Sequence, residues 1–243
     1  MVTGPIIPTP GAVMECTKLL YEYLGDLIVL DVGGATTDLH SVTVESDQVA
    51  RLMISPEPKA KRTVEGDLGV YVNRWKVVES IGEEKLREQC REQGFSMEHA
   101  LETYRAIPKT EEEVKLVELL TREAVVKAAE RHAGRLRYIY GPSGRSTVAE
   151  GKDLTQVKYI VGTGGALTRL PHREEIMREI TRCNESGMLL LPGEHAQILV
   201  DHDYIMASLG VLSKRYPQAA ARLLEQSLGM TFPERKAEEP VPV

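Results

Sequence analysis

One segment limits the possible folds more than any other, the stretch LIVLDVGGATTDLHSVTV at positions 27–44. Its first four residues are all apolar, as a buried strand requires, and apolar and polar residues alternate from Asp38 to Val44. Gly33 and Gly34 separate these two halves. The pattern therefore predicts two strands joined by a tight glycine turn.

The same turn carries the groups with which proteins bind phosphate and Mg²⁺. Glycines allow backbone N–H groups to approach a phosphate closely. Thr36 adds a hydroxyl donor, and Asp31 is a carboxylate that can hold the water shell of Mg²⁺. A plain hairpin would also contain Asp and Gly, because both residues favour turns. From the spacing alone, both interpretations stay open.

A second glycine-rich segment, VKYIVGTGGALTRLP at positions 157–171, has the pattern of a strand, a turn and a helix. It departs from the dinucleotide motif G-x-G-x-x-G, because the third glycine would fall on Leu167. The segment GPSGRST, at positions 141–147, lacks the lysine and the spacing of a P-loop. A glycine-lined slot for a nucleoside and an ordinary strand-to-helix turn remain as the two interpretations.

Around these segments the hydrophobic pattern predicts an α/β chain with a helical middle. We expect helices over 12–24, over 83–132 with a break near 107–108, from Pro171 to Cys183, and over 203–228; we expect strands over 49–54, 136–140, 157–161 and 188–191, with turns over 141–155. The predicted organisation is a lead-in and short helix (1–25), a lobe (26–232, with parts 26–80, 81–134 and 135–232) and a flexible tail (233–243).

Composition excludes several classes of protein. Aromatic residues make up only 5% of the chain, so its core is built from aliphatic side chains, which favours helices packed on a buried sheet. A net charge of -6 disfavours broad nucleic-acid or anionic-membrane binding. The three cysteines are scattered, and no apolar run reaches the length of a membrane span. We therefore expect a cytoplasmic protein with neither a disulfide framework nor a zinc site.

The order and separation of the two glycine motifs resemble those of the actin, Hsp70 and sugar-kinase ATPase superfamily. DVGGATTD resembles its second phosphate motif, and GTGG resembles its adenosine motif. PTPGAVMECTKLLYEYLGD, RTVEGDLG and DHDYIMASLGVLSKRYPQAAARLLEQSLG extend the resemblance over nearly the whole chain, to the MutL-type family associated with glutamate mutase. The resemblance implies a ribonuclease H-like lobe with a mixed sheet, flanking helices and a helical insertion. It also implies binding of ATP or ADP with Mg²⁺, and reactivation of an adenosylcobalamin-dependent mutase, with self-association as a further option.

The same resemblance implies roles for individual residues. Asp31 would hold Mg²⁺ through water or orient an attacking water, whereas Gly33, Gly34 and Thr36 would contact the β- and γ-phosphates. The adenosine and α-phosphate would lie against the second motif, with Arg169 nearby but one position later than in the Hsp70 pattern. That second motif consists of Gly162, Thr163, Gly164 and Gly165.

Some acidic and histidine residues are ambiguous on sequence alone. Asp38 fits either the phosphate site or a hairpin position facing the loop. Glu65 and Asp67 fit either a site role or a helix N-cap. His195 and His202 have poor spacing for a metal site, even with Asp203 beside them.

Only one phosphate hairpin occurs in the sequence, whereas the superfamily closes ATP between two similar halves. We therefore expect the chain to correspond to the C-terminal half of a MutL-type protein, as a piece of a longer chain or as a naturally short product. Such a half should bind nucleotide weakly, and hydrolysis by it should be slow or absent. A non-catalytic interaction module that retains this half-fold is the alternative, and a kinase of the same superfamily is a third interpretation.

Overall fold

The computed structural model describes residues 7–142, 144–184 and 186–234. Its centre is a five-stranded mixed sheet with the order β3-β2-β1-β6-β7. The strands β1, β2 and β3 form an antiparallel meander, and β6 runs parallel to both β1 and β7. The strand bounds are β1 Leu27–Val32, β2 Thr37–Val42, β3 Ala60–Glu65, β6 Tyr159–Thr163 and β7 Gln197–Val200.

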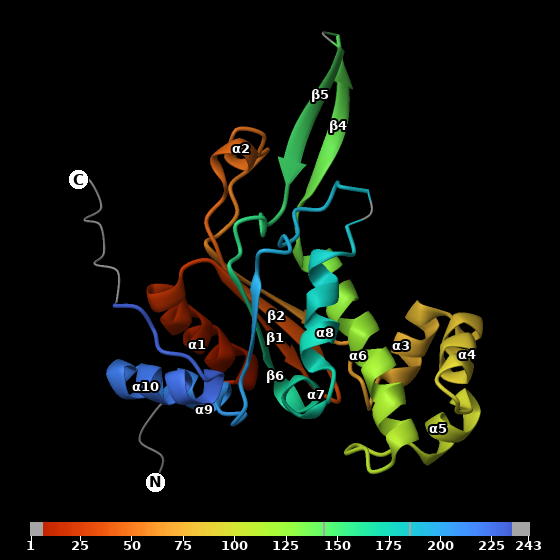
Figure 1. The fold of residues 1–243 in the computed structure, drawn as a ribbon. Helices are drawn as coiled ribbons and strands as arrows, with labels where there is room; N and C mark the ends of the chain where they lie inside the picture. The colour runs from red at the N-terminus through yellow and green to blue at the C-terminus, as the bar shows by residue number, and fades with distance from the viewer. Residues whose placement is uncertain (1–6, 143, 185, 235–243) are drawn as a thin grey trace.

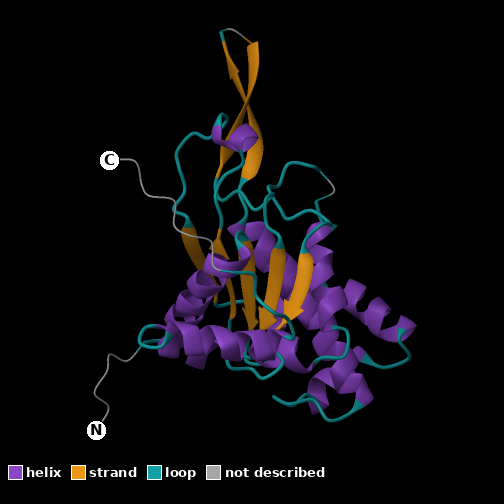
Figure 2. Cartoon of the chain, turned by 60° about the vertical axis from the view of Figure 1, so that its left-hand side comes forward, coloured by secondary structure: helices purple, strands orange, loops and turns teal. Residues whose placement is uncertain are grey.

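Helices cover both faces of this sheet (Figures 1 and 2). The helices α1 (Thr9–Leu24), α9 (Met206–Ser213) and α10 (Pro217–Leu228) lie on one face; α6 (Glu111–His132), α7 (Gly164–Arg169) and α8 (Arg173–Arg178) lie on the other. Side chains of β1 alternate between the two layers, as the pleat requires. Leu27 and Val29 join the α1 side, whereas Ile28 and Leu30 join the α6 side.

The expected helical region over 83–132 is confirmed, with α4 (Glu83–Glu92) and α5 (Met97–Thr103) packed on α6. A further helix, α3 (Arg74–Ile81), precedes the predicted range and also packs on α6. One side of α6 is apolar and faces the core, where Leu120, Ala124 and Ala128 are fully buried. Thr110 and Glu113 form a capping box that begins this helix.

Some predicted elements are wrong. Positions 49–54 form no strand, because Ser46 caps a short helix, α2 (Asp47–Ala50), instead. Positions 188–191 form only an isolated bridge at Leu189, and the nearby strand is β7. The helix expected from Pro171 begins later, at Arg173, and ends in a short 3-10 helix, η1 (Glu179–Thr181).

The turn-rich segment after the strand at 136–140 contains a further strand that the sequence did not predict. The strands β4 (Arg135–Gly141) and β5 (Gly144–Glu150) pair as a long antiparallel ribbon. This ribbon projects beyond the main body, at the end opposite α7 (Figure 1). The rest of the segment, after β5, runs through Lys152 to the parallel strand β6.

The predicted lead-in and tail fall partly outside the described residues, which exclude 1–6 and 235–243. The first helix begins at Thr9, after Pro8 at its N-cap. Within the described ranges, no helix combines the length and apolar character that crossing a bilayer requires.

Candidate functional site

The two glycine segments lie more than a hundred positions apart in the sequence, and they meet at the carboxyl ends of the central strands β1 and β6. Because β1 and β6 are parallel neighbours, the residues that follow them emerge on the same side. The chain leaves β1 toward β2 on one side of this pair, and it leaves β6 toward β7 on the other. The carboxyl ends of strands at such a switch in strand order are where open α/β sheets bind ligands.

Gly164 packs directly against the end of β1. Its φ angle is +83°, and a Cβ there would lie 2.5 Å from Asp31 Oδ1 and 2.5 Å from the Val32 carbonyl oxygen. Any side chain would separate the second glycine segment from the first. Glycine is therefore required both by the backbone conformation and by the close approach.

The turn after β1 is held by hydrogen bonds from its own backbone and from the segment after β3. The Gly33 N–H donates to the Thr36 carbonyl at 2.9 Å, and the Gly34 carbonyl accepts from the N–H groups of Tyr71 and Val72. Gly69 leaves no space for a side chain, because its Cβ would lie 2.2 Å from Ala35. The Gly33 N–H is thus already used inside the turn, contrary to its expected role as a phosphate donor.

Two carboxylates face each other across β1 and β2, since Asp31 pairs with Asp38 in the strand register. Burial raises the pKa of Asp31 to about 6, and the negative charges of Asp38 and Asp201 act in the same direction. Burial likewise raises the pKa of Asp38 to about 6, with Arg62 opposing and Glu65 adding to this effect. Among the described residues Asp31 accepts no hydrogen bond, so a cation or its bound water would stabilise the ionised form.

The sequence did not indicate a role for Asp201, which follows β7 and holds the glycine turn at the end of β6 in place. Its buried carboxylate accepts hydrogen bonds from the Thr163 hydroxyl at 2.8 Å and the Ser227 hydroxyl at 2.6 Å. It also accepts from the N–H groups of Ile205 and Met206. These contacts hold the loop after β7 against the end of β6.

That loop places Tyr204 beside the glycine turns. Tyr204 has a φ angle of +55°, a rare conformation for a residue with a side chain. Its pKa is raised by burial and by the charges of Asp31 and Asp201, so its ring lies near both carboxylates. Neither composition nor spacing marked this tyrosine, because its position depends on contacts of Asp201.

A cleft of about 570 Å³ opens between these turns and α6, within the size range of small-molecule sites. One wall contains the glycine turns and Arg169, and Arg169 makes no hydrogen bond or ion pair within the described parts of the chain. The opposite wall is apolar and aromatic. The lining residues are Gly33, Gly34, Val70, Tyr71, Tyr104, Ala106, Ile107, Pro108, Val114, Val117, Gly165, Ala166, Arg169, Leu170, Pro171 and Tyr204.

Five predicted site residues lie outside the lining, namely Asp31, Thr36, Gly162, Thr163 and Gly164. Asp31 and Gly164 lie against each other at the ends of β1 and β6. Gly162 is packed inside β6, where a Cβ would lie 2.6 Å from Met177 Sδ. Thr163 is buried with its hydroxyl bound to Asp201. Thr36 stands in the hairpin turn without lining the cleft.

The N-cap role expected for Glu65 or Asp67 is wrong, because the next helix, α3, has Asn73 at its N-cap. Glu65 and Asp67 both bind Arg131 of α6, at 2.6 Å and 2.8 Å. They fasten α6 to the end of β3. No cluster of three potential metal ligands occurs within the described ranges, and this includes the surroundings of His195 and His202.

Comparison with known proteins supplies the family. The family model described as MutL protein matches residues 1–228. The chain is also 35% identical, over 239 residues, to Protein MutL of Clostridium tetanomorphum. The chain belongs to the MutL protein family. The alignment covers 93% of this chain but 52% of that relative, so the chain spans about half the length of the curated MutL protein that it matches.

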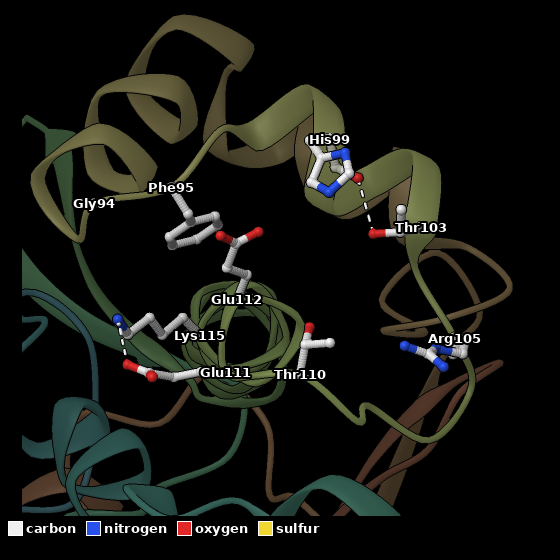
Figure 3. A pocket seen from close by; sticks show the side chains of 9 residues that line it. All are labelled: Gly94, Phe95, His99, Thr103, Arg105, Thr110, Glu111, Glu112 and Lys115. Atoms are coloured by element: carbon white, nitrogen blue, oxygen red, sulfur yellow. Dashed lines mark hydrogen bonds and ion pairs between the residues drawn. The ribbon is translucent and has the colours of Figure 1, made fainter.

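The MutL match includes both glycine turns, the cleft and the β4–β5 ribbon. A second hollow, of about 580 Å³, lies away from them between α5 and the start of α6 (Figure 3). Polar side chains from both helices surround it, and some pair with each other, as Lys115 does with Glu111 at 2.7 Å. No residue of the glycine turns lines this hollow. The cleft is therefore the stronger candidate site of this MutL chain.

Proposed function

We propose that this MutL chain is the ATP-binding half of a reactivation chaperone for an adenosylcobalamin-dependent aminomutase such as glutamate mutase. The observation that carries the proposal is the contact of Gly164 with Asp31 and Val32, which joins the two glycine segments into one site. The family likeness supports the choice of partner.

The sheet topology supports assignment of the fold to the actin and Hsp70 superfamily. A hairpin turn after the first strand and a glycine turn after a parallel neighbour are the two phosphate and nucleoside elements that the resemblance requires. The cleft lies where both turns meet. A helical segment, α3 to α5, stands where the expected insertion belongs.

The residues of the cleft fit a nucleotide with Mg²⁺. The N–H of Gly34 makes no hydrogen bond within the described residues and is free to donate to a phosphate. Gly165 has nothing within 4 Å of its Cβ position, which leaves space for a ligand, and Arg169 supplies a positive charge at the same wall. Asp31, at the end of β1 beside the cleft, would hold Mg²⁺ through water, and the ion would neutralise phosphate charge.

Binding and hydrolysis are separate parts of this proposal. Every donor named above comes from one side of the cleft, and transfer of a phosphoryl group requires positioned charges around the whole phosphate. We propose that this chain binds the nucleotide and that the other half of a full-length MutL protein completes the ATPase.

A thermal-shift experiment tests the nucleotide claim. Ligand at a hundred times its Kd stabilises a folded protein by about 2.7 kcal/mol, which corresponds to a Tm increase of a few degrees. We expect Mg-ATP to raise the Tm of the parent chain and to have little effect on Asp31→Ala. The exposed residue Asp47, in α2 at the far end of the molecule, provides a control. Asp47→Ala should respond to Mg-ATP as the parent does.

One outcome contradicts the claim that the cleft binds ATP. If the parent shows no shift, either alone or together with the remaining half of a MutL protein, the cleft binds no ATP. The interaction-module alternative would then be favoured, and a mutase complex on a sizing column that ignores nucleotide would support it.

A further inference from the structure

The β4–β5 ribbon is anchored at its base and unpaired beyond it. At the base, Leu136 N–H donates to the Met188 carbonyl on one edge, and Ile54 N–H donates to the Ala149 carbonyl on the other. A small apolar cluster around Val49 and Ala149 fixes this end. From position 137 to position 148 no third strand joins either edge within the described residues. The part of the ribbon from 137 to 148, called the arm below, therefore extends from a fixed base with both strand edges open (Figure 1).

The outer half of this arm exposes large apolar and aromatic side chains. Tyr138, Ile139 and Tyr140 are 47%, 51% and 79% exposed. Two-stranded ribbons are marginally stable in water, and large apolar side chains left exposed to water in a group mark an interaction surface. Tyr138 and Tyr140 share a face of the ribbon, and Arg145 is the cross-strand neighbour of Tyr140. Tyrosine and arginine are the residues most enriched at the energetic centres of protein interfaces.

The charge of the arm is opposite to that of the chain. Arg137 is paired with Glu150 at 2.7 Å, but neither Arg135 nor Arg145 has a carboxylate partner within the described residues. Arg145 instead lies over the ring of Tyr138, at 4.4 Å from its centroid. The whole chain carries a net charge of -6, so this positive arm is a local exception. Three arginines are too few for strong binding to a phosphate backbone, which depends on many charge contacts.

We propose that the outer half of the β4–β5 ribbon is a docking surface for an acidic protein surface on a different chain. The tyrosine face supplies apolar contact, Arg145 pairs with acidic side chains, and the open strand edges offer backbone hydrogen bonds. This inference rests on the proposed function in one respect, since that function identifies the acidic partner as the mutase.

A matched pair of double variants tests this surface. Tyr138→Ser with Arg145→Glu removes one stacked tyrosine–arginine pair from the ribbon. Tyr216→Ser with Arg215→Glu removes another such pair, which is also exposed but lies between α9 and α10, away from the ribbon. Binding of each purified chain to the purified adenosylcobalamin-dependent mutase of the same organism is measured by biolayer interferometry at 50 and 300 mM salt. Circular dichroism and Tm establish that both variants are folded.

We expect the parent and the Tyr216/Arg215 control to bind equally, and the ribbon variant to bind at least tenfold more weakly. Higher salt should weaken binding of the parent, because exposed charge pairs are screened. Equal binding by the ribbon variant overturns this inference and leaves the proposed function intact. If even the parent fails to bind the mutase, the proposed function and this inference both fail.

Two further results would also overturn the inference. Sedimentation of the parent alone could reveal an oligomer that the ribbon variant loses, which would make the occupant a second copy of this chain. Fluorescence anisotropy with a labelled single-stranded oligonucleotide could reveal binding that depends on the ribbon, which would make the occupant a nucleic acid. The inference is supported only if neither assay depends on the ribbon and mutase binding does.

Discussion

Gly164 and Gly165 are sequence neighbours, but their surroundings differ completely. Gly164 has a positive φ angle and faces Asp31 and Val32 so closely that a Cβ has no space. Gly165 lies in α7, is exposed at the cleft, and has no atom within 4 Å of its Cβ position. The first glycine therefore holds the fold of the site together, and the second keeps its space open.

The substitution Gly164→Ala should destabilise the protein. The methyl group would be strained by the backbone conformation and would push β1 away from the turn, at a cost of more than about 2 kcal/mol. Urea unfolding followed by circular dichroism measures this loss. A stability equal to that of the parent would show that the two segments do not need this contact.

The substitution Gly165→Ala should leave stability unchanged or slightly higher, because alanine favours the helical conformation. The added methyl group lies in the cleft, so we expect the Mg-ATP thermal shift to become smaller than that of the parent. A variant with unchanged stability and an unchanged shift would place the nucleotide elsewhere. Together the two alanine variants separate folding of the site from its occupancy.

The sequence indicated the residues of the turns but could not reveal their environment. DVGGATTD predicts a hairpin from local conformational preferences alone, and the structure confirms that hairpin. By contrast, Asp201 and Tyr204 reach the site only after β7 pairs with β6, which is a long-range event. The motif gave Gly162 and Gly164 the same role, yet the pleat of β6 turns the Cβ position of Gly162 toward Met177. Local pattern cannot decide such directions before the register is known.

Among the helices, α6 links the helical segment to the cleft. The side chain of Glu113 is 1% exposed and accepts hydrogen bonds from the N–H groups of Lys109 and Thr110. It also pairs with Arg105 at 2.8 Å. The loop between Arg105 and Lys109 contributes to the cleft wall. The start of α6 therefore fixes one side of the candidate site.

Replacement of Glu113 by alanine tests this link. Two backbone N–H groups and a guanidinium would lose a buried carboxylate, so we expect a loss of about 2 kcal/mol in stability and a weaker Mg-ATP shift. The control is Glu112→Ala, which removes an exposed neighbour in the same helical turn and should change neither quantity. Urea unfolding and the thermal shift measure both. If the two variants behave alike, the cap does not position the loop.

The wrong and unpredicted elements share a physical cause. The residues at 49–54 have the apolar character of a strand, but Ser46 caps a helix before a strand can form. Gly144 and the polar residues after it favour turns, yet register pairing with β4 makes them a strand. Strand formation depends on a partner more than on local preference. The helical signal of α6 is local, and this helix fills the part of the predicted range 83–132 that follows the break near 107–108.

For the whole molecule, four buried titratable groups around β2 set the pH dependence of stability. Burial lowers the pKa values of His40 and His132 to about 3, from 6.5. Burial raises those of Asp31 and Asp38 to about 6, from 3.8. Between pH 6 and pH 4 the unfolded chain binds two protons at the histidines, and the folded chain binds two at the aspartates. These two contributions oppose each other, so the four groups together should change the stability of the parent little in this window.

The substitution Asp38→Asn should remove this balance. One folded-state proton is lost, so stability should fall by about 1.4 kcal/mol for each pH unit from pH 6 to pH 4. Above pH 7 the variant should be more stable than the parent, by up to about 3 kcal/mol, because no buried carboxylate must ionise. Asp67→Asn has the opposite sign, since the Arg131 hydrogen bond lowers the pKa of Asp67; it should lose stability at pH 8, and this loss should become smaller as the pH falls below 3.8. Urea unfolding from pH 3 to pH 8 measures all three chains. Parallel curves for the parent and Asp38→Asn would mean that Asp38 is as well solvated in the folded protein as in the unfolded chain. That result would contradict the claim that Asp31 and Asp38 form a buried acidic pair beside the cleft.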